Sequence, residues 1–152
     1  MARFRYSMQS ILDIKLKMET QAKQEFSAAK AALDTEEELL EGLIDRKEGY
    51  ERESVELLAG PLHLKDIEDN RMAILWMGDS IAGQRLRISA AEKNLEQARE
   101  RLTGVMVERK THETLKEKAF QQFLTDEKRQ EGKEVDELTS YTYGQKEQEH
   151  VG

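Results

Sequence analysis

The sequence has no cysteine, one proline and few aromatic residues, and each of these absences excludes a class of protein. Without cysteine the chain forms neither a disulfide scaffold nor a thiolate metal site. Aromatic residues make up only 6% of the 152 residues and charged residues make up 36%, so the material for an ordinary compact core is lacking. Abundant charge with Ala, Leu and Gln and almost no proline is typical of long helices and coiled coils.

Long hydrophobic runs and a sustained basic surface are missing as well. The opening MARFRYSMQS lacks the apolar stretch of a signal peptide, and no segment approaches the roughly 20 residues of a membrane span. The net charge is −7, and residues 34–56 alone hold ten acids against three bases. Nucleic acid requires a basic face. We therefore expect a cytoplasmic protein with no nucleic-acid partner and no direct membrane insertion.

The clearest pattern that is present is an apolar residue at every seventh position in the second half of the chain. This series consists of Ile67, Ile74, Ile81, Ile88, Leu95 and Leu102. Apolar residues also stand three positions after several of its members, at Met77, Ala91, Ala98 and Val105. Such spacing places one seam along a helix, as in a left-handed coiled coil. Beyond Leu102 the pattern weakens, because Arg109 and Lys116 take the equivalent positions.

The first half of the chain carries a weaker stripe with spacings of three and four, which predicts a second amphipathic helix. Its members are Phe4, Met8, Ile11, Ile14, Met18, Ala22, Phe26, Ala29, Leu33, Leu40, Leu43, Tyr50 and Leu57. Between the two stripes, Gly60 and Pro61 predict the end of one helix. Asp66, with Asp69 three residues further on, predicts the cap of the next helix.

These signals predict an all-α fold, in which two long helices form a single antiparallel coiled-coil hairpin over the whole chain. A short connection between long helices favours antiparallel neighbours, and this pairing puts Phe4 opposite Phe120. The Gly-containing polar tail is predicted to fray. The predicted elements are a helix at about 3–58, a turn at about 59–65, a helix at about 66–140 and a frayed tail at 141–152.

Motifs for catalysis are weak or missing. Gly78-Asp79-Ser80 resembles part of a nucleophile elbow, but the second glycine comes too late and the motif lies within the heptad series. The nucleotide-binding pattern G-x-x-x-x-G-K-[ST] does not occur. Two packed helices also offer no pocket that shields a reaction. We therefore expect no enzymatic activity, no metal site and no cofactor.

The only tryptophan, Trp76, lies beside Leu75 in the same stretch. The heptad series places Ile74, Met77 and Ile81 in the seam, which turns Trp76 and Leu75 outward. Exposed Trp and Leu side chains often mark a contact with another protein. The alternative is that Trp76 folds back over the seam.

The two ends of the chain carry a resemblance to a known family. The opening FRYSMQSILDIKLKMETQAKQEFSAAKAAL has an aromatic–basic–aromatic start, then Q-x-I-L-D-I-K, then an Ala-rich helix. Towards the other end, the stretch LKEK at 115–118 is followed by a charged run containing Gln and by Asp136-Glu137-Leu138. Together and in this order, these features resemble the flagellar FliJ family over nearly the whole chain.

The resemblance implies a coupling rod of flagellar type III protein export, similar to the stalk (gamma) subunit of rotary ATPases and held at the cytoplasmic face of the inner membrane. Members of the family insert into the hexameric ring of the export ATPase, promote its assembly and activity, and contact the export-gate membrane protein. The implied gate-contacting residues are Leu39, Leu43, Tyr50, Trp76, Met77 and Ile81. The implied ATPase-contacting residues are Arg3, Arg5, Phe123, Asp136, Glu137 and Leu138.

Two alternatives stay open. One is a general export chaperone or escort, which would bind late flagellar subunits directly instead of acting on the ATPase. Export chaperones are a further expected partner of the chain. The other is a purely structural coiled coil, such as a parallel dimer interrupted at Gly60-Pro61.

Overall fold

The computed structural model describes residues 2–151, with side chains through residue 147, and contains two α-helices. Helix α1 spans Gln9–Ala59 and helix α2 spans Leu64–Val151. The two helices pack against each other as a helical hairpin, and no strand occurs in the described part of the chain. The predicted all-α hairpin is therefore confirmed.

Both helices begin at residues other than those predicted. α1 begins at Gln9 instead of about residue 3, because a turn precedes it, in which the amide of Gln9 donates to the Tyr6 carbonyl at 3.1 Å. α2 begins at Leu64, and the His63 carbonyl accepts the amide of Ile67 at 3.1 Å. Asp66 therefore lies within the first turn, where its negative charge interacts favourably with the positive end of the helix dipole. The predicted cap at Asp66 was wrong.

The end of α2 also differs from the prediction. Residues 141–151 are helical in the structure, where the sequence predicts a frayed tail, while Gly152 lies outside the described residues. The reason is local, because Glu, Lys and Gln favour helix and no proline interrupts the stretch. Every side chain from residue 128 to residue 147 is exposed, so this part of α2 stands in solvent on all sides.

The connection between the helices is short, as predicted. α1 ends at Ala59, two residues before Pro61, which lacks a backbone donor and disfavours helix in the residue before it. No glycine among the described residues has a positive φ, so Gly60 follows the helix without the left-handed conformation of a common helix cap.

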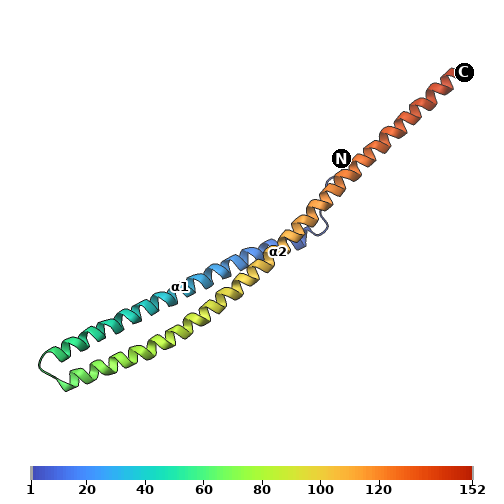
Figure 1. The fold of residues 1–152 in the computed structure, drawn as a ribbon. Helices are drawn as coiled ribbons and strands as arrows, with labels where there is room; N and C mark the ends of the chain where they lie inside the picture. Colours follow the sequence, from blue (N-terminus) through green and yellow to red (C-terminus); the bar gives the residue numbers. More distant parts are fainter. Residues whose placement is uncertain (1, 152) are drawn as a thin grey trace. The chain divides into compact units, whose positions relative to one another are not determined.

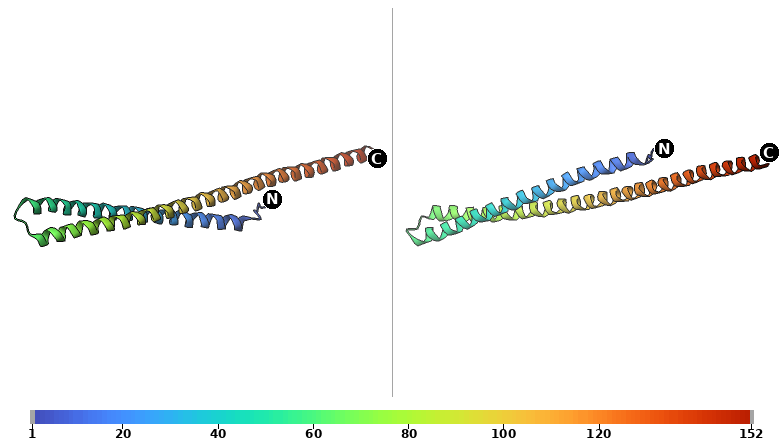
Figure 2. Two further views of the ribbon diagram at one scale, coloured as in Figure 1. Left: turned by 60° about the horizontal axis from the view of Figure 1, so that its bottom comes forward. Right: turned by 90° about the horizontal axis from the view of Figure 1, so that it is seen from above.

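The chain forms two compact units. The hairpin unit is Met18–Val105, and the terminal unit combines Met1–Lys17 with Met106–Gly152. In the hairpin unit α1 and α2 lie side by side up to the turn (Figure 1, green), and both views in Figure 2 agree. In the terminal unit the rings of Phe4 and Phe120 meet edge to face with centroids 5.2 Å apart. The predicted pairing of these two residues is confirmed.

The seam of the hairpin unit follows the predicted heptads. Met77 is only 2% exposed, and Ala22, Ile81 and Val105 are buried as well. The other isoleucines and leucines of the α2 series are half-buried at every seventh position. This regular burial is what a coiled-coil seam requires.

The early part of the predicted α1 stripe was wrong. Four of its members are exposed: Met8, Ile11, Ile14 and Met18. The inner face of α1 instead carries Leu12 and Glu19, which are buried, and Lys15, which is half-buried. Counting back by heptads from the seam residue Phe26 leads to Glu19 and Leu12, so the register of the longer apolar stretch decides which face is covered.

Candidate functional site

Two buried amides interrupt the apolar seam of the hairpin unit. The Asn70 side chain donates from Nδ2 to the Tyr50 carbonyl at 2.9 Å. The Gln84 side chain donates from Nε2 to the Glu36 carbonyl at 2.9 Å and also to the Glu36 carboxylate. Both residues stand three positions after an isoleucine of the heptad series, so their seam positions were readable from the sequence and were missed.

These amides fix the alignment of the two helices. Asn70 and Gln84 are 6% and 4% exposed, and a buried amide without a partner is costly. Each finds its partner in α1 only in the observed register, since a slip moves the carbonyl out of reach. The same register joins Arg101 and Glu25 in an ion pair of 2.7 Å at the edge of the seam.

A groove of about 750 Å³ runs along one edge of the hairpin unit. We call it the glycine groove, because each helix contributes one glycine, Gly42 and Gly83, to its lining. Two of the predicted gate-contacting residues, Leu39 and Leu43, line it together. Its remaining lining residues are Thr35, Glu38, Arg46, Ser80, Gln84 and Arg87.

The other predicted gate-contacting residues have different surroundings. Trp76 is 68% exposed, so its side chain points outward and does not fold over the seam. Met77 and Ile81 are buried in the seam, which leaves their side chains no free surface for a partner. Tyr50 is half-buried and lines a separate groove of about 440 Å³ near the turn, which also includes Ala73.

The predicted ATPase-contacting residues belong to the terminal unit and are mostly exposed. Arg3 and Arg5 precede α1 and are exposed, and so are the three residues Asp136, Glu137 and Leu138 on the solvated part of α2. Leu138 lines a shallow hollow of about 460 Å³ on that helix. Phe123 is instead half-buried against Phe4, with ring centroids 5.5 Å apart.

The inner face of the terminal unit is polar. Lys15 bonds to Glu108 at 2.8 Å, and the bond and the charge of Lys15 both lower the pKa of Glu108 below its ordinary value. Arg109, His112 and Lys116 occupy half-buried seam positions of α2. The Tyr6 hydroxyl and His112 Nδ1 are buried without a hydrogen-bond partner in the described structure. The sequence reading of a weakening pattern after Leu102 matches this polar seam.

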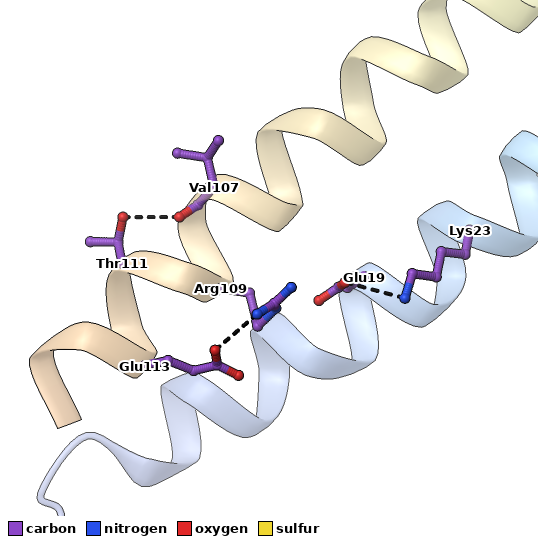
Figure 3. A network of polar contacts seen from close by, with 6 residues as sticks. All are labelled: Glu19, Lys23, Val107, Arg109, Thr111 and Glu113. Atoms are coloured by element: carbon purple, nitrogen blue, oxygen red, sulfur yellow. Dashed lines mark hydrogen bonds and ion pairs between the residues drawn. The ribbon is translucent and has the colours of Figure 1, made fainter. Parts of the chain in front are cut away.

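Ion pairs within one helix add support at several points. Figure 3 shows Arg109 with Glu113 at 2.8 Å in the terminal unit, and Lys23 with Glu19 at 3.3 Å in the hairpin unit. Thr111 donates its hydroxyl to the Val107 carbonyl at 2.9 Å in the same view. Such (i, i+4) ion pairs contribute only a few tenths of a kcal/mol each, so they adjust the helices without holding them together.

What these surfaces offer chemically is recognition by shape and charge. Among the described side chains, no group of three or more His, Cys, Asp and Glu residues could hold a metal ion. No helix within residues 2–151 combines the length and the apolar character that crossing a membrane requires. The two helices pack along an apolar seam that contains a few polar residues, and they expose apolar side chains to solvent. These features are those of a coiled-coil scaffold protein.

Comparison with known proteins identifies the family. Residues 4–148 match the protein family described as "Flagellar FliJ protein". The chain therefore belongs to the FliJ family and is a component of flagellar type III export. No individual curated protein is similar enough to count as a relative.

A solved structure supports the fold independently. A YscO homologue from Chlamydia trachomatis superimposes with a TM-score of 0.68 and is 22% identical in sequence. The similarity covers 96% of this chain and 99% of that chain. At this level of identity the likeness establishes the shared helical fold.

Proposed function

We propose that this chain is a non-enzymatic coupling component that promotes assembly and activity of the export ATPase ring and contacts the export gate. The observation that carries the proposal is the family match over residues 4–148. The two compact units support it further, because each has its own exposed surface and two partners need two surfaces. On this proposal the chain works in the cytoplasm at the inner face of the inner membrane.

The proposed contact with the ATPase uses the terminal unit. A helix that is exposed on all sides from residue 128 to residue 147 suits insertion into the centre of a hexameric ring, in the manner of a rotary stalk subunit. Leu138 is 66% exposed there, next to the acidic pair Asp136 and Glu137. Arg3 and Arg5 are exposed and add positive charge to the terminal unit. Phe123 contacts Phe4, and this contact anchors the segment before α1 that carries the two arginines.

The proposed contact with the gate uses the hairpin unit. Trp76 and Leu39 are exposed apolar side chains, and Trp in particular tends to dominate the binding energy of an interface. Leu43 and Tyr50, which follow Leu39 in α1, are half-buried and contribute the exposed parts of their side chains. Met77 and Ile81 hold the helix that presents Trp76, so their part in gate binding is structural.

The first experiment measures ATP hydrolysis by the export ATPase of the same cell during titration with the purified chain. We expect a saturable rise in rate together with hexamers in sedimentation. A chain that ends at Leu124 should lose both effects and keep gate binding, because it retains the whole hairpin unit. An unchanged rate and unchanged assembly with a fully helical chain would instead favour the escort-chaperone alternative.

The second experiment tests the gate contact with Trp76→Ala. We expect gate affinity to fall about tenfold or more, as for an interface hot spot, while helicity and ATPase stimulation stay unchanged. Leu86→Ala is the matched control, because Leu86 is as exposed on the same helix and is outside the proposed contact. Equal gate binding by the wild-type chain and Trp76→Ala would remove Trp76 from the interface.

A further inference from the structure

The glycine groove has a feature that the packing of α1 against α2 does not explain. Gly42 and Gly83 lie inside helices, and neither has the left-handed backbone that favours glycine. A Cβ atom built on either residue would meet nothing within 4 Å, so no close approach between the two helices requires them. Because glycine weakens a helix relative to alanine, both helices lose stability here without an internal gain.

The charges at the groove point to the same conclusion. The ion pair of Glu25 with Arg101 marks positions where α1 and α2 face each other along this edge. Moving two and three heptads from that pair towards the turn should reach equivalent facing positions. By this count an arginine stands opposite an uncharged residue at both places, Arg87 with Leu39 and Arg46 with Ser80, and all four residues line the groove.

Arg46 and Arg87 have no ion-pair partner among the described residues, although both line the groove. The only acid in the lining is Glu38, so the groove carries a net positive charge within an otherwise acidic protein. The two arginines come from opposite walls and lie one heptad apart along the edge, which corresponds to about 10 Å. An occupant therefore needs negative charge on both of its flanks.

We infer that the glycine groove binds an acidic amphipathic α-helix of a partner protein. The apolar ridge of that helix lies over Gly42 and Gly83 against Leu39, and acidic side chains on its two flanks pair with Arg46 and Arg87. A helix fits because the space between two parallel walls of helical side chains is where a third coiled-coil strand packs. An extended peptide would find no sheet edge for its backbone.

This inference rests on the proposed function in one respect, because Leu39 and Leu43 also belong to the proposed gate contact. It deepens that function by giving the chemistry of the partner segment. Trp76 stands one heptad from Gly83 at the equivalent position of α2, so it extends the same face beyond the groove. A docked helix longer than the groove would therefore reach Trp76.

The experiment measures binding of a labelled synthetic helix to the full chain by fluorescence anisotropy. The probe is an Ala-based peptide of about three heptads with Leu along one ridge and Glu on both flanks, and a sister peptide carries Lys in place of Glu. The variants are Gly83→Leu, which fills the groove, and Gly104→Leu as its control. Gly104 has the same heptad position three heptads further along α2 and equally open surroundings.

We expect the Glu peptide to bind at least about tenfold more tightly than the Lys peptide. Gly83→Leu should weaken Glu-peptide binding about tenfold, and Gly104→Leu should leave it unchanged. Arg87→Glu should reverse the preference between the two peptides, and this surface variant provides a test that does not depend on the groove being filled. Equal affinity for both peptides, or equal effects of the two glycine variants, would overturn the inference.

Binding of the gate's cytoplasmic portion to the same variants separates this inference from the proposed function. If the wild-type chain fails to bind the gate while the peptide results stand, the gate contact is refuted and the groove's preference for acidic helices is upheld. If the gate binds and the peptides show no charge preference, the groove inference is refuted and the gate contact is upheld.

Discussion

In the hairpin unit, the seam between α1 and α2 is filled by apolar side chains such as Met77 and Ile81, whereas in the terminal unit equivalent positions hold Lys15, Arg109 and Lys116. Exposed apolar side chains occur in both units, and in the hairpin unit they include Leu75 and Trp76. In the terminal unit the α1 residues Ile11 and Ile14 and the α2 residues Leu115 and Leu124 are exposed.

The difference between the two seams bears on stability. Burial of apolar surface contributes roughly 25 cal/mol per Å², while an exposed ion pair contributes between about 0 and 1 kcal/mol. The hairpin unit therefore holds the fold together. The terminal unit leaves apolar surface in solvent and satisfies its inner face with weaker polar contacts, as expected for a segment that gains stability when a partner covers it.

The largest expected effect comes from the same substitution made in each unit. Ile81→Ala removes a side chain that is 9% exposed, and we expect a loss of about 3 kcal/mol in the free energy of unfolding. Ile14→Ala removes one that is 54% exposed, and we expect a change within about 0.5 kcal/mol. Urea unfolding followed by circular dichroism measures both. Similar losses for the two variants would contradict the division between the units.

The next effect concerns the buried amide of Gln84. Gln84→Ala removes its bonds to Glu36, and we expect a loss of about 1–2 kcal/mol in the free energy of unfolding. Gln97→Ala, at an exposed position of the same helix, should be neutral.

The apolar variant Gln84→Met refines this test. We expect it to stay within about 1 kcal/mol of wild type and to loosen the alignment of the helices. Because the chain has no cysteine, a disulfide between Glu25→Cys and Arg101→Cys can report the alignment. Unchanged disulfide yield in Gln84→Met would show that the amide does not set the register.

The sequence predicted the parts of the fold that depend on one helix and its period. The isoleucine series of α2 and the turn at Pro61 were sufficient for the hairpin, because apolar period and proline act locally. The early face of α1 was predicted wrongly, since Ile11 and Ile14 form a more apolar stripe than Leu12 and Lys15 do. Only the register set by the hairpin unit decides between those two stripes.

The candidate site was harder to predict for the same reason. Trp76 was correctly placed outward, because one helix and its heptads determine that direction. The glycine groove was not predicted, since Gly42 and Gly83 come together only through the stagger of two helices. Nothing in either local sequence specifies that stagger without the amides of Asn70 and Gln84.

A smaller effect is expected at the aromatic contacts of the terminal unit. Phe4→Ala removes ring contacts with Phe120 and Phe123, each worth about 0.5–1.5 kcal/mol. Amide hydrogen exchange around Phe120 should become faster, while exchange in the hairpin unit stays unchanged. Tyr143→Ala, which removes an exposed ring without a ring contact, is the control. Unchanged exchange in Phe4→Ala would mean that the segment before α1 does not stabilise this unit.

The smallest expected effect is the pH response of the pair Lys15 and Glu108. The hydrogen bond and the charge of Lys15 hold the pKa of Glu108 below its ordinary value of 4.5. A carboxyl whose pKa is lower in the folded state stabilises that state above its unfolded pKa, and this contribution is lost as pH falls through the folded pKa. Lys15→Met should therefore raise the pKa of Glu108 in an NMR titration and flatten the stability profile on the acid side. Because Glu108 is exposed, stability at neutral pH should change little. A Glu108 pKa that is unchanged in Lys15→Met would show that this pair does not form in solution and that the terminal unit is held without it.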